Sequence, residues 1–336
     1  MVPRLAWFVV WLLATALVAG CSPAGRGQEA PAPDVTLTLP PEPEVLPEFP
    51  ARMLARGDLG FPFLAYDTFG PGRVALAAPA ERGSVAVLVA EFSQGSLQAV
   101  STVGEPMGAV LDVTHGHLLN NGEPQAVVTT EKGLLILLRT EQYFKVEQAG
   151  LEKTFVGDWD GDGKSEAAIV HTQEGRQQVT VIRYTPEGQG EAVGSFAAPE
   201  FPLRAAVLQR GQGERTLLMG AEHGEGSMQV TFYSLDPVEG LKVTARYPLG
   251  NTSDEPFVSF SAGELAGRPT LVVSRLGDPS YLELFDSAAE GMPSRGRIAL
   301  PDDEVYVVMP GTFAGQARSE LLAMTPDGRW VLYGLD

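Results

Sequence analysis

The stretch GDWDGDGKSE, residues 157–166, places four carboxylates within nine positions, with two glycines among them. Carboxylates at alternating positions of a tight turn converge on one point, where they repel one another unless a cation lies between them. Hard oxygen donors in this number suit Ca²⁺, which takes about six to eight oxygen ligands in a flexible geometry. The stretch therefore predicts a calcium-binding loop.

Each ligand of this loop follows from its chemistry and position. Asp158, Asp160 and Asp162 are expected to bind the ion through their side chains. Lys164 would contribute its backbone carbonyl, and Glu166 would close the site. We expect a structural ion, because nothing in the motif prepares a metal-bound water for attack. The alternative is an Asp- and Gly-rich turn that binds no ion.

The loop lies between strands, not between helices. An EF-hand needs a Glu at its twelfth position, which is Ile169 here. The flanking segments KTFV and AAIV are also strand-like. Gly161 and Gly163 permit the backbone angles of so tight a turn. An EF-hand is therefore excluded, and the loop must be positioned by a β-sheet.

From about residue 51 the chain consists of short apolar runs with partial alternation, separated by Gly, Pro and Asp turns. Two of these segments align without gaps: GDWDGDGKSEAAIV (157–170) and GTFAGQARSELLAM (311–324). GHLLNNGEPQAVVT (116–129) is a weaker copy, and three looser copies complete a series. The first apolar residues after the six loops are Val74, Ala126, Ala167, Leu217, Leu271 and Leu321. Their separations of 52, 41, 50, 54 and 50 residues match four-stranded propeller blades, which repeat every ~40–50 residues.

The two ends of the repeat region complement each other. The last copy stops after its third strand, at Asp336, and the orphan segment ARMLARGDLG (51–60) resembles a fourth strand. If this segment completes the last blade, the ring closes and no sheet edge stays open. We therefore predict an all-β protein: a β-propeller over residues 51–336 with six four-stranded blades, closed by an N-terminal strand. Seven blades, through a missed degenerate copy, and a stacked β-sandwich are the alternatives.

The pattern D-x-D-x-D-G-x-x-E followed by a β run resembles the FG-GAP/VCBS-type repeat of integrin-α-like β-propellers. The resemblance covers most of residues 51–336, although one copy alone carries the full acidic motif. The family pattern usually ends in Asp, whereas this chain has Glu166, whose longer side chain could shift the geometry or affinity of the loop. In the weaker copy Leu119, Asn121 and Gln125 replace acidic residues, so that blade is expected to hold its turn without an ion.

Other candidate chemistry is weaker. His115 and His117 lie two residues apart, so a transition-metal site is conceivable, but no third His or Cys lies nearby in the sequence. The sequence contains no G-x-S-x-G, G-x-x-x-x-G-K-[ST] or H-E-x-x-H motif. Asp302 and Asp303 would point to opposite faces of a strand, which favours solvation over catalysis. These observations favour a protein that is not an enzyme.

The first twenty residues predict an export signal. Arg4 opens the segment, and the apolar run LAWFVVWLLATALVAG of 16 residues is shorter than the roughly 20 needed to span a membrane. It leads into LVAGC (17–21), which closely resembles a bacterial lipoprotein lipobox. By that resemblance, cleavage precedes Cys21, and acyl chains on Cys21 anchor the protein to a membrane. Because Cys21 is the only cysteine, no intrachain disulfide can form; the alternative is an ordinary secreted protein with a chance cysteine.

Residues 21–50 are expected to form a tether between the anchor and the fold. Eight prolines lie in this segment, and proline fixes φ and removes a donor, which gives an extended, semi-rigid chain. The formal net charge is −18, from 42 acidic and 24 basic residues, which disfavours nucleic acid as a partner. The acidic residues are spread along the chain, as on an ordinary solvated surface.

Together these features predict an extracytoplasmic protein of the cell envelope, periplasmic or on the cell surface, held to a membrane through Cys21. The expected function is a non-catalytic binding or scaffolding module with a structural calcium loop, whose partner is an envelope protein or a glycan. The alternative is a calcium-dependent propeller hydrolase acting on phosphate esters or glycans. A phosphate hydrolase would need clustered acidic loops with Lys or Arg, whereas here one loop is fully acidic and the chain has five lysines.

Overall fold

The computed structural model describes most of the chain from residue 48 onward, within one compact unit. The described residues are 48–63, 65–68, 72–79, 85–103, 108–139, 142–199, 202–209, 215–223, 227–236, 239–251, 257–276, 279–289, 291–301, 307–315 and 319–335. The predicted signal peptide, Cys21 and nearly all of the tether lie outside them. Among these residues, no helix has the length and apolar character needed to cross a membrane.

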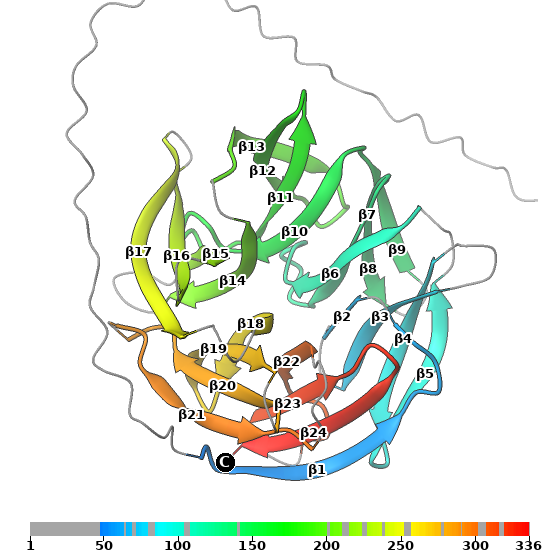
Figure 1. Ribbon diagram of the computed structural model, residues 1–336. Helices are drawn as coiled ribbons and strands as arrows, with labels where there is room; N and C mark the ends of the chain where they lie inside the picture. The colour runs from blue at the N-terminus through cyan, green and yellow to red at the C-terminus, as the bar shows by residue number, and fades with distance from the viewer. Residues whose placement is uncertain are drawn as a thin grey trace, which may run out of the picture. The chain divides into compact units, whose positions relative to one another are not determined.

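In the described part of the chain, 24 strands form six antiparallel sheets of four strands each. The predicted six-bladed propeller is therefore confirmed (Figure 1), and the seven-bladed and sandwich alternatives are wrong. The first three blades are β2–β5 (Ala65–Thr68, Arg73–Pro79, Val85–Ser93, Ser96–Val103), β6–β9 (Val110–Gly116, Gln125–Thr130, Gly133–Arg139, Gln142–Glu147) and β10–β13 (Leu151–Gly157, Glu166–Gln173, Arg176–Tyr184, Gly190–Ala197). The other three are β14–β17 (Leu203–Gln209, Arg215–His223, Ser227–Asp236, Gly240–Asn251), β18–β21 (Phe257–Leu265, Arg268–Arg275, Tyr281–Asp286, Ser294–Ala299) and β22–β24 (Val307–Gly311, Ser319–Met324, Arg329–Leu335) with β1 (Ala51–Asp58).

The ring is closed by its N-terminal strand, as the sequence predicted. Strand β1 pairs antiparallel with β24, from Ala51 opposite Leu335 to Asp58 opposite Arg329. The last blade therefore takes three strands from the C-terminal end of the fold and its outermost strand from the N-terminal end (Figure 1). Pairing the first strand of the propeller with its last strand joins the first and last repeats, so neither is left with an unpartnered face.

The hydrophobic core lies between the blades. Six clusters of buried side chains each combine residues of two neighbouring blades. In one of them, Phe155 and Trp159 of the third blade pack with Leu218 and Tyr233 of the fourth. A single blade would leave both of its faces exposed, so the ring as a whole buries what no repeat can bury alone.

The second strand of each blade is the most buried because it packs on both faces. All six residues of β7 are buried, as are all six of β23. A strand covered on both sides carries a near-continuous apolar run instead of alternation. This explains why segments such as AAIV and ELLAM showed no clean period of two in the sequence.

The first glycine of the repeat allows neighbouring blades to approach closely. A Cβ on Gly263 would lie 2.4 Å from Cγ of Pro310 in the next blade, and one on Gly116 would lie 2.4 Å from Cγ1 of Val156. Gly157 faces the fourth blade at a similarly short distance. These glycines are therefore required by the close contact between neighbouring blades. This differs from Gly161 in the acidic loop, whose φ of 80° demands a glycine.

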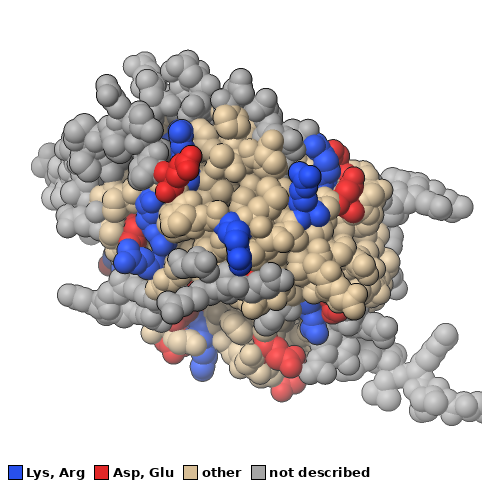
Figure 2. Space-filling model, turned by 90° about the horizontal axis from the view of Figure 1, so that it is seen from below, with Lys and Arg blue, Asp and Glu red and all other residues tan. Residues whose placement is uncertain are grey.

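Charged side chains on the face seen in Figure 2 are scattered among uncharged ones and form no single patch. Basic and acidic residues stand near one another at several points of that face. This arrangement agrees with the interpretation of the acidic residues as an ordinary solvated surface.

Candidate functional site

The acidic loop joins the first and second strands of the third blade, β10 and β11, as predicted. Its first carboxylate organises the turn: Asp158 Oδ1 accepts the backbone N–H of Gly161 at 2.7 Å, and Oδ2 accepts that of Gly163 at 2.9 Å. Both glycines have positive φ, 80° and 84°. The backbone is thus wrapped around the Asp158 carboxylate by its own donors, in a conformation that only glycine adopts without strain.

The next two aspartates repeat this local pattern. Asp160 Oδ1 accepts the N–H of Asp162 at 3.1 Å, and Asp162 Oδ1 accepts the N–H of Lys164 at 2.8 Å. In each case one carboxylate oxygen fixes the backbone two residues on. The second oxygen of each side chain faces the guanidinium of Arg183.

Glu166 closes the loop from the start of β11. Its side chain is almost fully buried, and its Oε2 accepts the N–H of Trp159 at 3.4 Å, while the indole Nε1–H of Trp159 donates to the Glu166 carbonyl at 3.1 Å. Burial raises the pKa of Glu166, and hydrogen bonds from Arg183 and Trp159 oppose that rise. A Glu at this position therefore clasps the two ends of the loop together.

The other copies of the repeat use the same clasp. In the sixth blade Glu320 Oε2 accepts the N–H of Phe313 and, at 2.6 Å, that of Ala314. In the second blade Gln125 Oε1 accepts the N–H of Leu119 at 2.9 Å. The side chain that ends the motif thus has a structural role in a loop with no acidic cluster, which supports the expectation that degenerate blades hold their turns without an ion.

A cation of the protein itself lies in the acidic cluster. Nη2 of Arg183 is 3.1 Å from Asp160 Oδ2 and 3.1 Å from Asp162 Oδ2, and the guanidinium also pairs with Glu166. Its Nε–H donates to Glu166 Oε1 at 2.9 Å. The hydrogen bond to Glu166 is the main cause that raises the pKa of Arg183. One guanidinium therefore offsets much of the repulsion that the loop would otherwise suffer.

Arg183 was missed by the sequence reasoning, although a signal was present. Strands β11 and β12 are joined by a two-residue turn at Glu174 and Gly175, both with positive φ. Gln173 pairs with Arg176 across that turn, and the register continues to Ala167 opposite Ile182. Counting one step further along the hairpin sets Arg183 beside the closing Glu of the loop.

Three of the five predicted ligands converge on one point. One carboxylate oxygen from each of Asp158, Asp160 and Glu166 lies within 4.8 Å of the other two. Among the described residues, these three form the group of acidic, His or Cys side chains whose spacing would allow them to share a metal ion. Such separations fit oxygens that share one Ca²⁺ with bond lengths of about 2.3–2.6 Å. The other two predicted ligands are not in this group: Asp162 forms an ion pair with Arg183, and the backbone N–H of Lys164 donates to Asp162. The donor chemistry therefore suits calcium, provided that Arg183 withdraws.

The loop is braced on both sides by neighbouring blades. Asn120 of the second blade donates from Nδ2 to the Ser165 carbonyl at 3.2 Å and accepts the Ser165 N–H at 2.9 Å. On the other side, Thr216 of the fourth blade donates its N–H to the Asp158 carbonyl at 2.6 Å, and its Oγ1 accepts the Asp158 N–H at 3.1 Å. The acidic loop thus links three consecutive blades.

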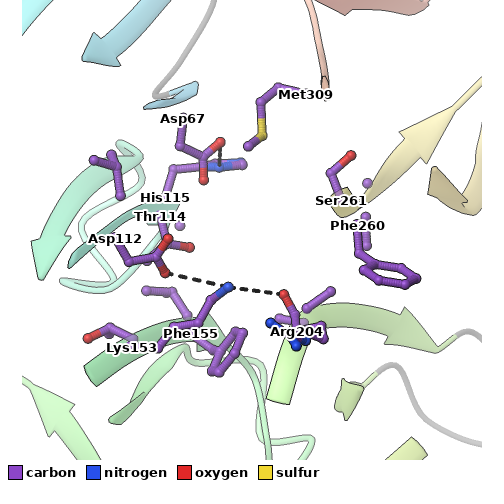
Figure 3. Close-up of a pocket in the computed structure, with 18 of the residues that line it drawn as sticks. Asp67, Asp112, Thr114, His115, Lys153, Phe155, Arg204, Phe260, Ser261 and Met309 are labelled. Atoms are coloured by element: carbon purple, nitrogen blue, oxygen red, sulfur yellow. Dashed lines mark hydrogen bonds and ion pairs between the residues drawn. The ribbon is translucent and has the colours of Figure 1, made fainter. Parts of the chain in front are cut away.

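A second group of polar side chains lies in the cavity at the centre of the ring (Figure 3). His115 Nδ1 is 2.9 Å from Asp67 Oδ1. Burial tends to lower the pKa of His115, but the charge of Asp67 and its hydrogen bond raise it overall. Asp112 has a pKa raised to about 6, chiefly by burial and against the charge of Lys153. His115 thus pairs with a carboxylate, and no metal-like group of described residues includes it or His117.

The sequence reasoning named His115 but not its partner, nor the other charged residues of this cavity. Asp112 and Lys153 occupy corresponding positions of β6 and β10, each just after an irregularity in the pairing. A single charged residue in a strand gives no sign of facing a channel. Only the ring arrangement brings the six first strands together.

Comparisons with known proteins identify the fold. A chain of the crystal structure of BBS1N in complex with ARL6DN matches with a TM-score of 0.50 and 12% identity, over 87% of this chain and 97% of that chain. A protein from Lactobacillus plantarum matches with a TM-score of 0.44 and 14% identity, over 80% and 87%. The N-terminal domain of Nup159 matches with a TM-score of 0.41 and 13% identity, over 89% and 99%. No family model and no curated protein sequence matches the chain, so the FG-GAP/VCBS resemblance stays a prediction.

Proposed function

We propose that this protein is a membrane-anchored, extracytoplasmic binding module whose propeller presents the face around the acidic loop to a partner protein or a glycan. The observation that carries the proposal is the bracing of that loop by Asn120 on one side and Thr216 on the other. A loop fixed across three blades keeps one shape at the surface, which lowers the entropy cost of binding a partner. The similar fold of BBS1N, which forms a complex with ARL6DN, is consistent with such a role.

The anchor in this proposal is the lipidated Cys21, followed by the proline-rich segment to residue 50. Acylation of one cysteine by several chains gives stable membrane attachment, because each buried CH₂ contributes about 0.8 kcal/mol. Mass spectrometry of the N-terminal peptide from the native membrane should find an acylated Cys21 with residues 1–20 removed. An unmodified Cys21 in a soluble fraction would refute this part of the proposal.

The acidic loop in this proposal holds one structural Ca²⁺. Asp158, Asp160, Asp162 and Glu166 would supply carboxylate oxygens, and Lys164 its carbonyl. The bound ion would supply the positive charge that the crowded carboxylates require. Arg183 holds three of these carboxylates, so ion and guanidinium compete for the same oxygens. Calcium binding is therefore expected to be weaker than the count of acidic ligands suggests.

Terbium luminescence tests the site directly, because Tb³⁺ takes oxygen ligands as Ca²⁺ does and Trp159 lies within the loop as a sensitiser. We expect sensitised emission that Ca²⁺ reverses. Asp160→Asn should remove it, whereas Arg183→Gln should strengthen binding by about tenfold, since a competing charge-assisted contact is lost. Thr185→Val, outside the loop, serves as the control. No emission from either the wild type or Arg183→Gln would show that the guanidinium replaces the ion altogether.

Affinity capture of the anchored protein from its native envelope, in calcium and then in EDTA, tests the binding function. A stoichiometric partner retained by the wild type and lost by Asn120→Ala would support recognition through the braced loop. A partner retained by the wild type and by this variant would place recognition elsewhere on the ring. The absence of any partner, together with phosphate-ester or glycan hydrolysis that EDTA abolishes, would favour the hydrolase alternative instead.

A further inference from the structure

The ring encloses a cavity of about 620 Å³, lined by the first strands of all six blades (Figure 3). A volume of this order is typical of sites for small organic ligands. The walls are chemically divided, because charged side chains gather on β2, β6, β10 and β14, while the fifth and sixth blades contribute uncharged residues such as Ala262 and Met309. A ligand that fills the cavity must therefore carry both a charged and an apolar part.

The charge available to a ligand is positive. Arg204 lies at an irregularity of β14, where the pairing with β15 shifts between Leu203 and Ala205. Such a bulge turns a side chain out of the regular alternation. The Arg204 guanidinium makes no hydrogen bond or ion pair with any described residue, although it lines the cavity. An unpaired guanidinium is a preformed fork of donors for a carboxylate or a phosphate.

Lys153 extends this basic group from the neighbouring blade. Its Nζ donates to the Arg204 carbonyl at 3.2 Å and lies 5.3 Å from the ring centre of Phe155. Asp112 Oδ2 is 3.9 Å from the same Nζ, which is too far for a hydrogen bond. Since an ammonium has three N–H donors, Lys153 retains donors for a ligand beside Arg204.

Both carboxylates of the cavity already face a basic side chain, Asp67 that of His115 and Asp112 that of Lys153 at 3.9 Å, which argues against a cationic ligand. Asp67 pairs with His115, accepts the N–H of Thr68 at 2.7 Å, and has a side chain that is 8% exposed. On the opposite wall, Ser261 is 7% exposed, and its Oγ has no hydrogen-bond partner among the described residues. This hydroxyl gives the apolar wall one donor that a ligand oxygen or water can satisfy.

We propose that the central cavity binds a carboxylate carried on an apolar body, with Arg204 and Lys153 holding the carboxylate and Met309 contacting the apolar part. This goes beyond the binding function proposed above, because it requires neither the acidic loop nor the anchor. The net charge of −18 repels anions only over about a Debye length, roughly 8 Å in physiological salt. Inside the cavity Asp67 and Asp112 each face a basic side chain, whereas Arg204 has no acidic partner among the described residues.

Isothermal titration of the full chain in detergent with 3-phenylpropionate tests the proposal, with 3-phenylpropionamide as the neutral match. We expect the acid to bind about 10- to 100-fold more tightly than the amide, the range that a charge-assisted contact supplies. Arg204→Gln should weaken binding of the acid by a similar factor. Arg246→Gln, an exposed arginine on β17, makes the same charge change outside the cavity and should leave binding unchanged.

A second arm distinguishes small molecules from chain ends, which share this chemistry. Short hydrophobic peptides with a free and an amidated C-terminus replace the two small probes. If the free acid binds more tightly than the amide, and Arg204→Gln abolishes this difference, the proposal is supported. Whether the small molecule or the peptide shows the difference identifies the source of the carboxylate. Equal binding of acid and amide, unchanged binding by Arg204→Gln, or no binding of any of these carboxylates at millimolar concentration would overturn it. Circular dichroism of each variant must match the wild type.

Discussion

The contact between Gly263 and Pro310 offers a test of why the repeat carries its first glycine. A methyl group at position 263 would lie 2.4 Å from Pro310 Cγ and 3.1 Å from its Cβ. If the blades could separate, Gly263→Ala would stabilise the protein by about 0.4–1 kcal/mol, through loss of freedom in the unfolded chain. If they cannot, overpacking should destabilise it by about 1–3 kcal/mol. The sign alone therefore distinguishes the two cases, and we expect destabilisation.

A double-mutant cycle tests the cause of that change. Pro310→Ala removes the clashing Cγ and leaves Cβ at 3.1 Å, a tight but tolerable contact. The pair Gly263→Ala and Pro310→Ala should then cost at least about 1 kcal/mol less than the sum of the single changes. Gly116→Ala, whose methyl group would meet Val156, serves as a control that should add independently to Pro310→Ala.

Calorimetry and urea denaturation measure this cycle. A loss of 1–3 kcal/mol corresponds to a fall in Tm of roughly 2–5 °C in a domain of this size. Each single variant should keep the m-value of the wild type if unfolding remains cooperative. A stabilised Gly263→Ala, or full additivity with Pro310→Ala, would refute the idea that this glycine exists for contact between blades.

Three further predictions concern closure, the clasp and pH. Deleting residues 51–58 removes the strand that covers β24, and should lower Tm and produce oligomers in light scattering through the open edge; a monomer of unchanged Tm would contradict this. Glu320→Ala leaves the two N–H groups that it accepts without a partner and should destabilise by about 1–3 kcal/mol in urea denaturation, with Glu320→Gln costing less; equal effects would discount the clasp. Because burial raises the pKa of Asp112 to about 6, the folded state binds its proton more tightly than the unfolded state does. The free energy of unfolding should therefore fall by about 1–3 kcal/mol as pH rises from about 4 to 6. Asp112→Asn should remove this dependence on pH. If the slope is the same in this variant, other titratable groups cause the pH dependence.

The propeller could be predicted from the sequence because its signals are local and repeated. Apolar runs, turn residues and the interval between Ala126, Ala167 and the other anchors give the strand content and the blade length. Each anchor lies on the second strand of its blade, the most buried one. The extra segment at residues 51–60 also indicated how the ring closes, because the last repeat lacks one strand and this segment can supply it.

The acidic loop was predictable in composition but only partly in its contacts. Side chains that act within the loop, such as Asp158 on Gly161 and Gly163, follow from short-range turn chemistry. The Arg183 guanidinium lies 17 residues beyond Glu166 in the chain and reaches it through a hairpin register. That register can be counted from the turn, but it becomes meaningful only once the hairpin is known to form.

The sequence by itself thus determined the strands, their repeat, the closing segment and the acidic loop, because each depends on residues close together in the chain or on a regular interval. Only the tertiary structure decided what meets across blades. The contact of Gly263 with Pro310 and the grouping of Lys153 with Arg204 join residues about 50 positions apart. Which residues meet across two blades depends on the rotation between the blades and on how closely they pack. Neither quantity can be read from the sequence of a single repeat.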